Sequence, residues 1–353
     1  MAADWIAGRI EPKMVRIDAS TACQLRCPSC PTTTGQVGAS LGTGFLRVED
    51  FKKFVDDNPS VRAIELSNWG EIFLNPGLPE IVKYAHDEGV ALYAENGVNL
   101  NRASDEVLDA LVKYRFRSMT CSIDGASRET YAIYRRRGDF EGVIRNVRRI
   151  NELKAQYRSK FPVLLWQFVV FGHNEHEIAR ARGLAKELNM RFFVKLSWGA
   201  MFEPEAFSPV NDRETVRRAT RAGVADRREY SDTYGEDYRQ RRTCSQLWRT
   251  PQMNWDGRVL GCCVNYWGDF GNAFTGGLIE SVNGEKMQYA REMLAGRKPE
   301  RDDVPCTTCV HYLAMKRRGR WLRRRDAGLP PLLESARLFV KRRWPELSWR
   351  LRG

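Results

Sequence analysis

Three cysteines near the start of the 353-residue chain have the spacing of a metal-binding loop. Cys23, Cys27 and Cys30 form a Cys-x3-Cys-x2-Cys triplet directly after a short apolar run. Three thiolates on one loop suit a cubane iron–sulfur cluster, and three ligands for four irons leave one iron open to a substrate or cofactor. Zinc is the alternative, but zinc usually takes a fourth Cys or His nearby, and none occurs between Cys30 and His86. The triplet therefore predicts a cluster with an open coordination position.

A second group of cysteines lies in the last third of the chain. Cys244 and Cys262 are 18 residues apart, Cys306 follows 44 residues later, and Cys309 completes a Cys-x2-Cys pair. Four thiolates saturate either a cubane cluster or a structural zinc ion, so we expect this site to be closed to further ligands. Cys263 adjoins Cys262 and is the alternative fourth ligand.

Alternating strands and helices between residues 15 and 197 must position the first triplet. Apolar, β-rich runs predict strands at 15–20, 61–67, 90–96, 117–124, 163–170 and 191–197. Segments of helical period predict helices at 48–57, 78–89, 104–114, 140–157 and 175–189. Six βα units predict an α/β fold, a partial (β/α)6 TIM-like barrel that eight units would close. Chemistry is expected at the carboxyl ends of its strands.

The chain divides into four predicted parts. Residues 1–200 form the partial barrel, 201–243 a polar connector, 244–312 a small cluster domain and 313–353 a basic helical tail with aromatic residues. The net charge of +13 is concentrated at the end, since residues 311–353 carry thirteen Lys or Arg and three Asp or Glu. The tail could pack back on the barrel, lie on an anionic membrane surface or grip an acidic partner. No nucleic-acid module accompanies it, so we expect no nucleic-acid substrate.

The expected cellular location of the protein follows from two features that the sequence lacks. No run of eighteen apolar residues occurs, and the N-terminus carries acids and a proline where a signal peptide needs an apolar core. We therefore expect a cytoplasmic protein, peripheral to a membrane if the tail binds one. In reducing cytoplasm, clustered cysteines favour metal sites over disulfides.

The triplet after the first strand, followed by six βα units, resembles the radical S-adenosylmethionine (SAM) enzymes, whose three-cysteine 4Fe–4S cluster binds SAM. Gly70 and Glu71 look like the end of that family's "GGE" element, although Trp69 stands in place of the first glycine. Asn96 falls in a stretch similar to the "TNG" element. Ser122 and Asp124 fall in one similar to its "S-x-DG" element.

The resemblance implies a set of cofactor-binding residues, to which Gln167, on the fifth strand and expected to face the barrel mouth, is added. That set is Gly70, Glu71, Asn96, Ser122, Asp124 and Gln167. From the residues alone, a glycine allows close backbone approach, Glu71 can accept from an ammonium group, and Ser122 and Asn96 offer small hydrogen-bonding groups. A turn glycine, a capping aspartate and a solvated glutamate are the structural alternatives.

The second cysteine group resembles the single-cluster "twitch" form of the SPASM auxiliary domain, including the stretch WDGRVLGCC. The resemblance makes Cys244, Cys262, Cys306 and Cys309 the ligands of an auxiliary 4Fe–4S cluster. Five cysteines after the barrel limit the domain to one such cluster. Cys121, inside an apolar strand, is read as a small core residue.

Together these resemblances imply an enzyme with two 4Fe–4S clusters that cleaves SAM to a 5′-deoxyadenosyl radical, fed by an electron donor such as a flavodoxin or ferredoxin. The favoured reaction is oxidation of a small polar metabolite, a sugar-like or cyclitol-like alcohol. The alternative is a peptide maturase that cross-links or epimerises a ribosomal peptide, and a non-catalytic metal scaffold is the third hypothesis. Because the first cysteine is at position 23, no leader-binding domain is expected before the barrel. Lys195, Trp198 and Glu203 are, with Gln167, the candidates to face substrate.

Overall fold

A seven-stranded parallel sheet forms the centre of the protein. The computed structural model describes residues 5, 6, 8–198 and 207–327. The strands follow the order β6-β5-β4-β3-β2-β1-β7, and every neighbouring pair is parallel. They are β1 (Met14–Ile17), β2 (Ala63–Glu65), β3 (Ala91–Val98), β4 (Ser118–Ser122), β5 (Val163–Val170), β6 (Arg191–Leu196) and β7 (Gln252–Met253).

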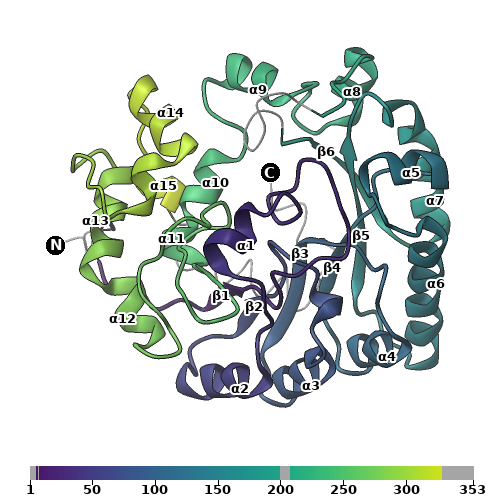
Figure 1. The fold of residues 1–353 in the computed structure, drawn as a ribbon, viewed down its shortest axis with the longest axis horizontal. Helices are drawn as coiled ribbons and strands as arrows, with labels where there is room; N and C mark the ends of the chain where they lie inside the picture. Colours follow the sequence, from purple (N-terminus) through teal and green to yellow (C-terminus); the bar gives the residue numbers. More distant parts are fainter. Residues whose placement is uncertain (1–4, 7, 199–206, 328–353) are drawn as a thin grey trace.

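Helices cover the outer side of this sheet. They form an arc along the lower and right sides of Figure 1: α2 (Val48–Asp57), α3 (Leu78–Asp87), α4 (Asp105–Lys113), α5 (Arg128–Tyr134), α6 (Phe140–Gln156) and α7 (Ile178–Glu187). Each turns an apolar stripe inwards; in α2, Phe51 and Phe54 are buried while the lysines between them are not. The sheet and helices therefore share one core.

The predicted partial barrel is confirmed, with one strand more than expected. All six predicted strands form, and a seventh, β7, joins the edge beside β1. The amide of Asp18 donates to the Met253 carbonyl at 3.0 Å, and Arg16 Nε donates to Gln252 Oε1 at 3.0 Å. The strand order runs from β6 to β7 without returning, so the barrel stays open.

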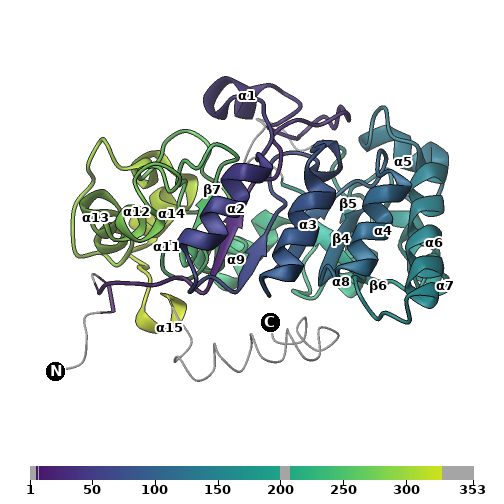
Figure 2. The ribbon, with the colours of Figure 1, turned by 90° about the horizontal axis from the view of Figure 1, so that it is seen from below.

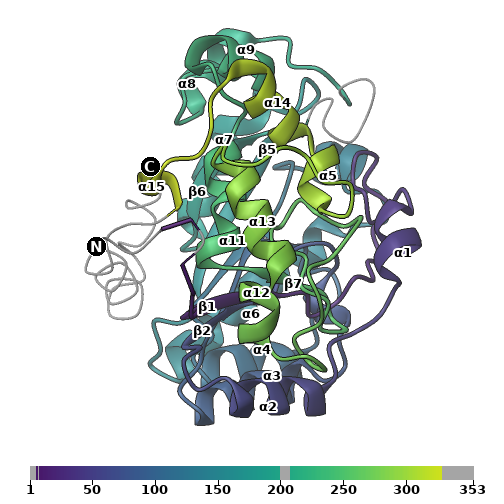
Figure 3. The ribbon, with the colours of Figure 1, turned by 90° about the vertical axis from the view of Figure 1, so that its left-hand side faces the viewer.

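The remaining helices belong to the connector and to the segment beyond it. The connector contains two helices, α8 (Arg213–Ala219) and α9 (Arg227–Tyr234), and Asp212 and Asp226 each cap a helix N-terminus. The later helices are α10 (Gln240–Cys244), α11 (Gln246–Arg249), α12 (Leu278–Asn283), α13 (Glu285–Leu294), α14 (Val310–Arg318) and α15 (Arg324–Ala327). Figure 3 shows α11 to α15 on the side that faces the viewer.

The first part of the basic tail packs against the protein. Leu322 is buried, its amide donates to the Leu294 carbonyl at 2.9 Å, and Arg241 pairs with Asp326 at 2.6 Å. The rest of the predicted tail, residues 328–353, lies outside the described residues, as does Glu203. Within the described ranges, none of the helices combines the length and the apolar character that crossing a membrane requires.

Candidate cysteine-centred active site

The cysteine triplet lies on a long loop at the carboxyl edge of the sheet. The loop leaves β1, and the short helix α1 (Gln36–Leu41) that follows it rises above the other helices in Figure 2. Cys27 is buried, whereas Cys23 and Cys30 are partly exposed. The amide of Cys30 donates to the Cys27 carbonyl at 3.2 Å, and the amide of Arg26 donates to the Arg136 carbonyl at 3.0 Å. The loop is therefore tied both to itself and to the segment after α5.

The thiols of Cys23 and Cys27 are weakly solvated, and each lies close enough to Cys30 to be affected by its charge. Burial raises the pKa of Cys23 to about 12, and the neighbouring charges of Glu71, Cys27 and Cys30 raise it further. Burial likewise raises the pKa of Cys27 to about 11, against the favourable charge of Arg135. Apolar walls and adjacent thiols suit a cation that would draw off all three protons.

The donor set fits a cluster rather than a single ion. The described ranges contain no group of three or more His, Cys, Asp or Glu arranged to hold one metal ion. In an iron–sulfur cubane each thiolate binds a different iron, so the three sulfurs need not converge on one point. Three closely coupled thiols on one loop meet that requirement.

Gly70 and Glu71 lie directly against the cysteine loop. A Cβ at Gly70 would stand 2.2 Å from the Ser20 carbonyl oxygen, so the close approach that this glycine permits is to the loop's own backbone. The Glu71 amide donates to the Ala22 carbonyl at 2.8 Å. The buried Glu71 carboxylate accepts from the amides of Phe73 at 3.2 Å and Asn99 at 2.5 Å. Burial raises the pKa of Glu71 to about 7.

Trp69, the departure from the family pattern, has a packing role of its own. Its indole lies in a cluster with Val37, Leu41 and Leu260, and its ring centroid is 5.4 Å from that of Tyr266. The Thr32 hydroxyl, on the cysteine loop, donates to the Trp69 carbonyl. A glycine here would leave the space between α1 and the residues after β7 unfilled.

Asn96 belongs to an amide chain that reaches the second cysteine group. Its Nδ2 donates to Asn68 Oδ1 at 2.6 Å, and Asn68 Nδ2 donates to the Cys263 carbonyl at 3.1 Å. Asn68 was not singled out from the sequence, because an asparagine in a loop has no pattern that reveals a partner 195 residues away. The chain joins the ends of β2 and β3 to the segment that follows β7.

Ser122 and Gln167 form a buried polar pair on adjacent strands. Gln167 Nε2 donates to Ser122 Oγ at 3.2 Å, and the two residues are paired in register. A Cβ at Gly97 would stand 2.5 Å from Ser122 Oγ, and Gly97 has φ +139°, a region that L residues rarely adopt. Glycine at position 97 is therefore required for β3 to pass Ser122.

Asp124 acts on the cysteine loop through Arg135. The buried Asp124 carboxylate accepts from Arg135 Nε at 2.6 Å and from the Val169 amide at 2.7 Å. Arg135 Nη1 lies 3.8 Å from Cys27 Sγ. Asp124 thus holds a guanidinium against the buried thiol, which makes it a positioning residue among the described contacts.

Asn99 is a site residue that the sequence reading missed. Its Nδ2 lies 3.8 Å from Cys23 Sγ, and its Oδ1 accepts from Gln24 Nε2 at 2.8 Å. Together with Arg135, it places a hydrogen-bond donor beside a cluster thiol. Donors to ligand sulfurs are one means by which a protein tunes the potential of a cluster.

Lys195 carries a buried amine on β6. It is paired in register with Val169, two residues beyond Gln167, so Lys195 and Gln167 lie on the same face of the sheet. Its Nζ stands 5.2 Å from the Trp198 ring centroid. Burial lowers the pKa of Lys195 to about 7, helped by Arg239 and Arg227 and opposed by Asp124 and Cys263.

The second cysteine group gathers four thiols in a buried site. Burial raises the pKa of Cys244 well above its usual value, and the charges of Cys309, Cys262 and Cys306 add to the effect. Burial and the same neighbours, Cys262 and Cys309, raise the pKa of Cys306. The charge of Cys263 also raises the pKa of Cys244 and of Cys262, and the Cys263 sulfur lies 3.5 Å from Gln246 Nε2. The assignment of Cys262 rather than Cys263 as the fourth ligand stays a prediction.

The choice between the adjacent cysteines can be tested by their iron content. Cys262→Ser should lower the iron of reconstituted protein from about eight to about four atoms per chain, because one cubane loses a ligand. Cys263→Ser should keep about eight and serves as the matched control. Iron analysis with electron paramagnetic resonance measures both, and the reverse result would assign the ligand to Cys263.

Two family models match the chain in the regions that carry these cysteines. A model for the radical SAM superfamily matches residues 17–184. A model for an iron–sulfur cluster-binding domain, SPASM, matches residues 244–310. No curated protein sequence matches.

Solved structures share the fold of this chain. SuiB of Streptococcus suis bound to S-adenosylmethionine has 13% identity and a TM-score of 0.60, over 86% of this chain and 71% of SuiB. SuiB bound to its precursor peptide SuiA has 12% identity and a TM-score of 0.57, over 86% and 70%. The protein anSMEcpe, with bound AdoMet and the Cp18Cys peptide, has 16% identity and a TM-score of 0.55, over 95% and 98%.

Proposed function

Because this chain belongs to the radical SAM superfamily and carries a SPASM iron–sulfur domain, we propose that it oxidises a carbon of a small polar substrate, a sugar-like or cyclitol-like alcohol. The single observation that carries the proposal is the Asn68 bridge. Asn68 accepts a hydrogen bond of 2.6 Å from Asn96 at the mouth of the sheet. It donates one of 3.1 Å to the Cys263 carbonyl in the second cysteine segment. An electron acceptor held by the second group would therefore adjoin the mouth.

The two cysteine groups would have different roles in the proposed reaction. When bound, the first cluster with SAM supplies a radical that abstracts hydrogen from the substrate, and the second cluster supplies an acceptor for one electron. Cys23, Cys27 and Cys30 would hold the first, and Cys244, Cys262, Cys306 and Cys309 the second.

The chain's own residues have three tasks in this reaction. Glu71 retains free lone pairs beside its two backbone donors and can accept from the ammonium of SAM. Ser122, Gln167 and Asn96 offer hydrogen bonds at the strand ends to hydroxyl groups of the cofactor or substrate. Buried aromatic residues behind Cys27, such as Tyr134 and Phe171, exclude water from the cysteine loop.

Alcohol oxidation also requires a base, and Lys195 is the described residue best placed to serve. Its amine is buried on the inner face of β6, and it interacts with both Asp124 and Cys263, which belong to the two halves of the site. With its pKa near 7, a neutral Nζ can accept the hydroxyl proton of the substrate at physiological pH.

A peptide substrate is the second candidate. SuiB and anSMEcpe, which share the fold of this chain, have structures with the peptides SuiA and Cp18Cys. The open barrel could admit a peptide in the same way, and the same cysteine groups would serve a cross-linking oxidation.

The proposal predicts a deuterium transfer that separates these candidates. Anaerobically reconstituted protein, given SAM and dithionite, should release 5′-deoxyadenosine. With carbon-deuterated sugar or cyclitol alcohols, deuterium should enter the 5′-deoxyadenosine and a carbonyl product should form in about equal amount. Mass spectrometry measures both. No release of 5′-deoxyadenosine would exclude the radical chemistry, and transfer only from a deuterated peptide would exclude the small alcohol.

A further inference from the structure

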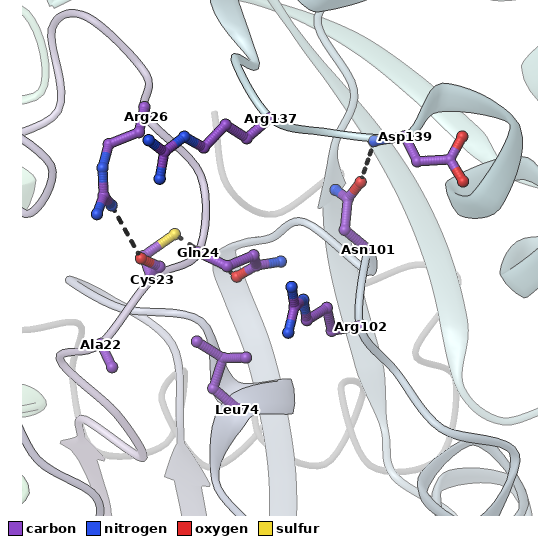
Figure 4. A pocket seen from close by; sticks show the side chains of 9 residues that line it. All are labelled: Ala22, Cys23, Gln24, Arg26, Leu74, Asn101, Arg102, Arg137 and Asp139. Carbon is purple, nitrogen blue, oxygen red and sulfur yellow. Dashed lines mark hydrogen bonds between the residues drawn. The ribbon is translucent and has the colours of Figure 1, made fainter.

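A pocket beside Cys23 remains unexplained by the chemistry at the mouth of the sheet. It has a volume of about 490 Å³, and Cys23 lines it together with three arginines, Arg26, Arg102 and Arg137 (Figure 4). Its lining includes none of the described residues assigned above to SAM or substrate. The pocket therefore approaches the cysteine loop from a different side.

The arginines bring unbalanced positive charge to this pocket. All three are exposed, and none forms an ion pair with a carboxylate within the described ranges. Figure 4 shows their guanidinium groups directed into the hollow. The one acid in the lining, Asp139, turns its carboxylate away and pairs with Arg145 at 3.3 Å. The pocket thus presents net positive charge to solvent.

Three separate loops contribute these charges. Arg26 comes from the loop after β1, Arg102 from the turn after β3 and Arg137 from the turn after α5. Arg137 has φ +66°, in the left-handed region that seldom suits a residue with a side chain. The Arg26–Arg136 backbone bond fastens the first loop to the third. The arrangement is built into the fold, and like charges brought together in this way attract an acidic partner.

We propose that this arginine-lined pocket is the docking surface for an acidic one-electron donor protein. The inference rests on the proposed radical SAM function, which requires a reduced cluster on the cysteine loop. Cys23 is partly exposed, so a protein seated over the arginines lies next to a cluster ligand. The donor's reduced flavin or iron–sulfur centre loses one electron, and the cluster on the cysteine loop gains it. No bond forms or breaks, and no proton moves.

A charge-reversal variant tests the docking surface. Arg102→Glu with Arg137→Glu inverts two of the three charges and spares Arg26, whose Nη1 donates to the Leu25 carbonyl at 3.0 Å and supports the loop. The matched control is Arg115→Glu with Arg158→Glu. Both control residues are exposed, have left-handed φ angles of 56° and 48°, and precede β4 and β5 at the opposite edge of the sheet.

The probe is a reduced flavodoxin, and the reconstituted protein is the target. At low ionic strength we expect flavodoxin to bind the docking variant with a dissociation constant about tenfold higher or more than for the wild type. The second-order rate of cluster reduction, followed by absorbance, should fall by about the same factor. The difference should shrink at high salt because surface charges are screened. The control variant should match the wild type, and reduction by dithionite should be unchanged in all three proteins.

Each alternative result overturns the proposal. Equal effects in the control variant would indicate only net charge, and unchanged flavodoxin binding in the docking variant would place the donor elsewhere. A third result would make the pocket a small-anion site. In that case inorganic phosphate raises the Tm of the wild type but not that of the docking variant, and the two proteins bind flavodoxin equally well. Failure of the proposed function would appear separately, as an absence of 5′-deoxyadenosine when dithionite is the reductant.

Discussion

Replacing Cys27 with alanine should abolish the release of 5′-deoxyadenosine from SAM and dithionite. Cys27 is the most buried thiol of the triplet, and it is the thiol that Arg135 faces at 3.8 Å. Two remaining thiolates cannot hold a four-iron cubane with a single open iron. Iron should fall from about eight to about four atoms per chain, since the second cysteine group keeps its own cluster. Iron analysis and chromatography of the SAM products measure the two effects.

Cys121→Ala is the matched control for this loss. Cys121 is fully buried in β4 and is paired in register with Trp166, so it belongs to the core. The exchange removes one buried thiol without touching either cysteine group, and iron content and SAM cleavage should both stay at the wild-type level. A Cys27→Ala protein that still cleaved SAM at the rate of this control would remove the triplet from the chemistry.

Local sequence signals predicted most of the elements that carry the site. The helix expected at residues 48–57 forms with those bounds, because its apolar residues recur at helical spacing and acids occupy its first turn. The strand expected at 163–170 also keeps its bounds, since a continuous apolar run in a parallel sheet is buried on both faces. Here the information lies within a few residues of each position.

The parts that escaped prediction depend on contacts between distant residues. Strand β7 is two residues long and has no periodicity, and it forms because Gln252 and Met253 find bonds on β1. The role of Trp69 required knowledge of Tyr266, and that of Asn68 required knowledge of Cys263. The contacts join segments that are 195 to 236 residues apart, and no local pattern encodes such a pairing.

The sequence therefore proposes site residues by their type, but it does not identify the partners of these residues in the fold. The cysteines, Glu71 and Ser122 could be named because their chemistry is specific and their positions follow strands. The sequence did not reveal that Asp124 faces Arg135 rather than solvent, because this contact depends on the packing of α5 against the sheet. It also could not bring Arg26, Arg102 and Arg137 into one pocket, because only the fold places their three loops together.

Lys195→Met should lower the rate of substrate oxidation by about 10² to 10⁴, the usual contribution of a positioned general base. Methionine keeps the length of the side chain and its apolar packing but cannot accept a proton. SAM cleavage in the absence of substrate should continue, because the cysteine loop is untouched. Product formation and 5′-deoxyadenosine are measured in parallel, and a loss of both would make Lys195 structural rather than a base.

The pH dependence should identify the same group. The base must be neutral to accept a proton. Burial and the charges of Arg239 and Arg227 lower the pKa of Lys195 to about 7, against the opposing charges of Asp124 and Cys263. The wild-type oxidation rate should therefore rise as the pH increases through about 7 and then level off. The residual rate of Lys195→Met should lack this rise. An identical pH profile in the variant would assign the titration to another residue.

Stability provides a second, independent measure of the buried amine. Its pKa is lowered in the folded protein from 10.5 to about 7, so between these values the unfolded chain binds a proton that the folded chain does not. Wild-type stability must then rise with pH across that interval. Below about pH 7 the folded protein holds a buried ammonium at a cost on the order of 5 kcal/mol, which Lys195→Met avoids. The variant should show the higher Tm at pH 6, and its advantage should shrink towards pH 10. An advantage that did not change with pH would mean that Lys195 is solvated in the folded protein, and the base would have to be sought elsewhere.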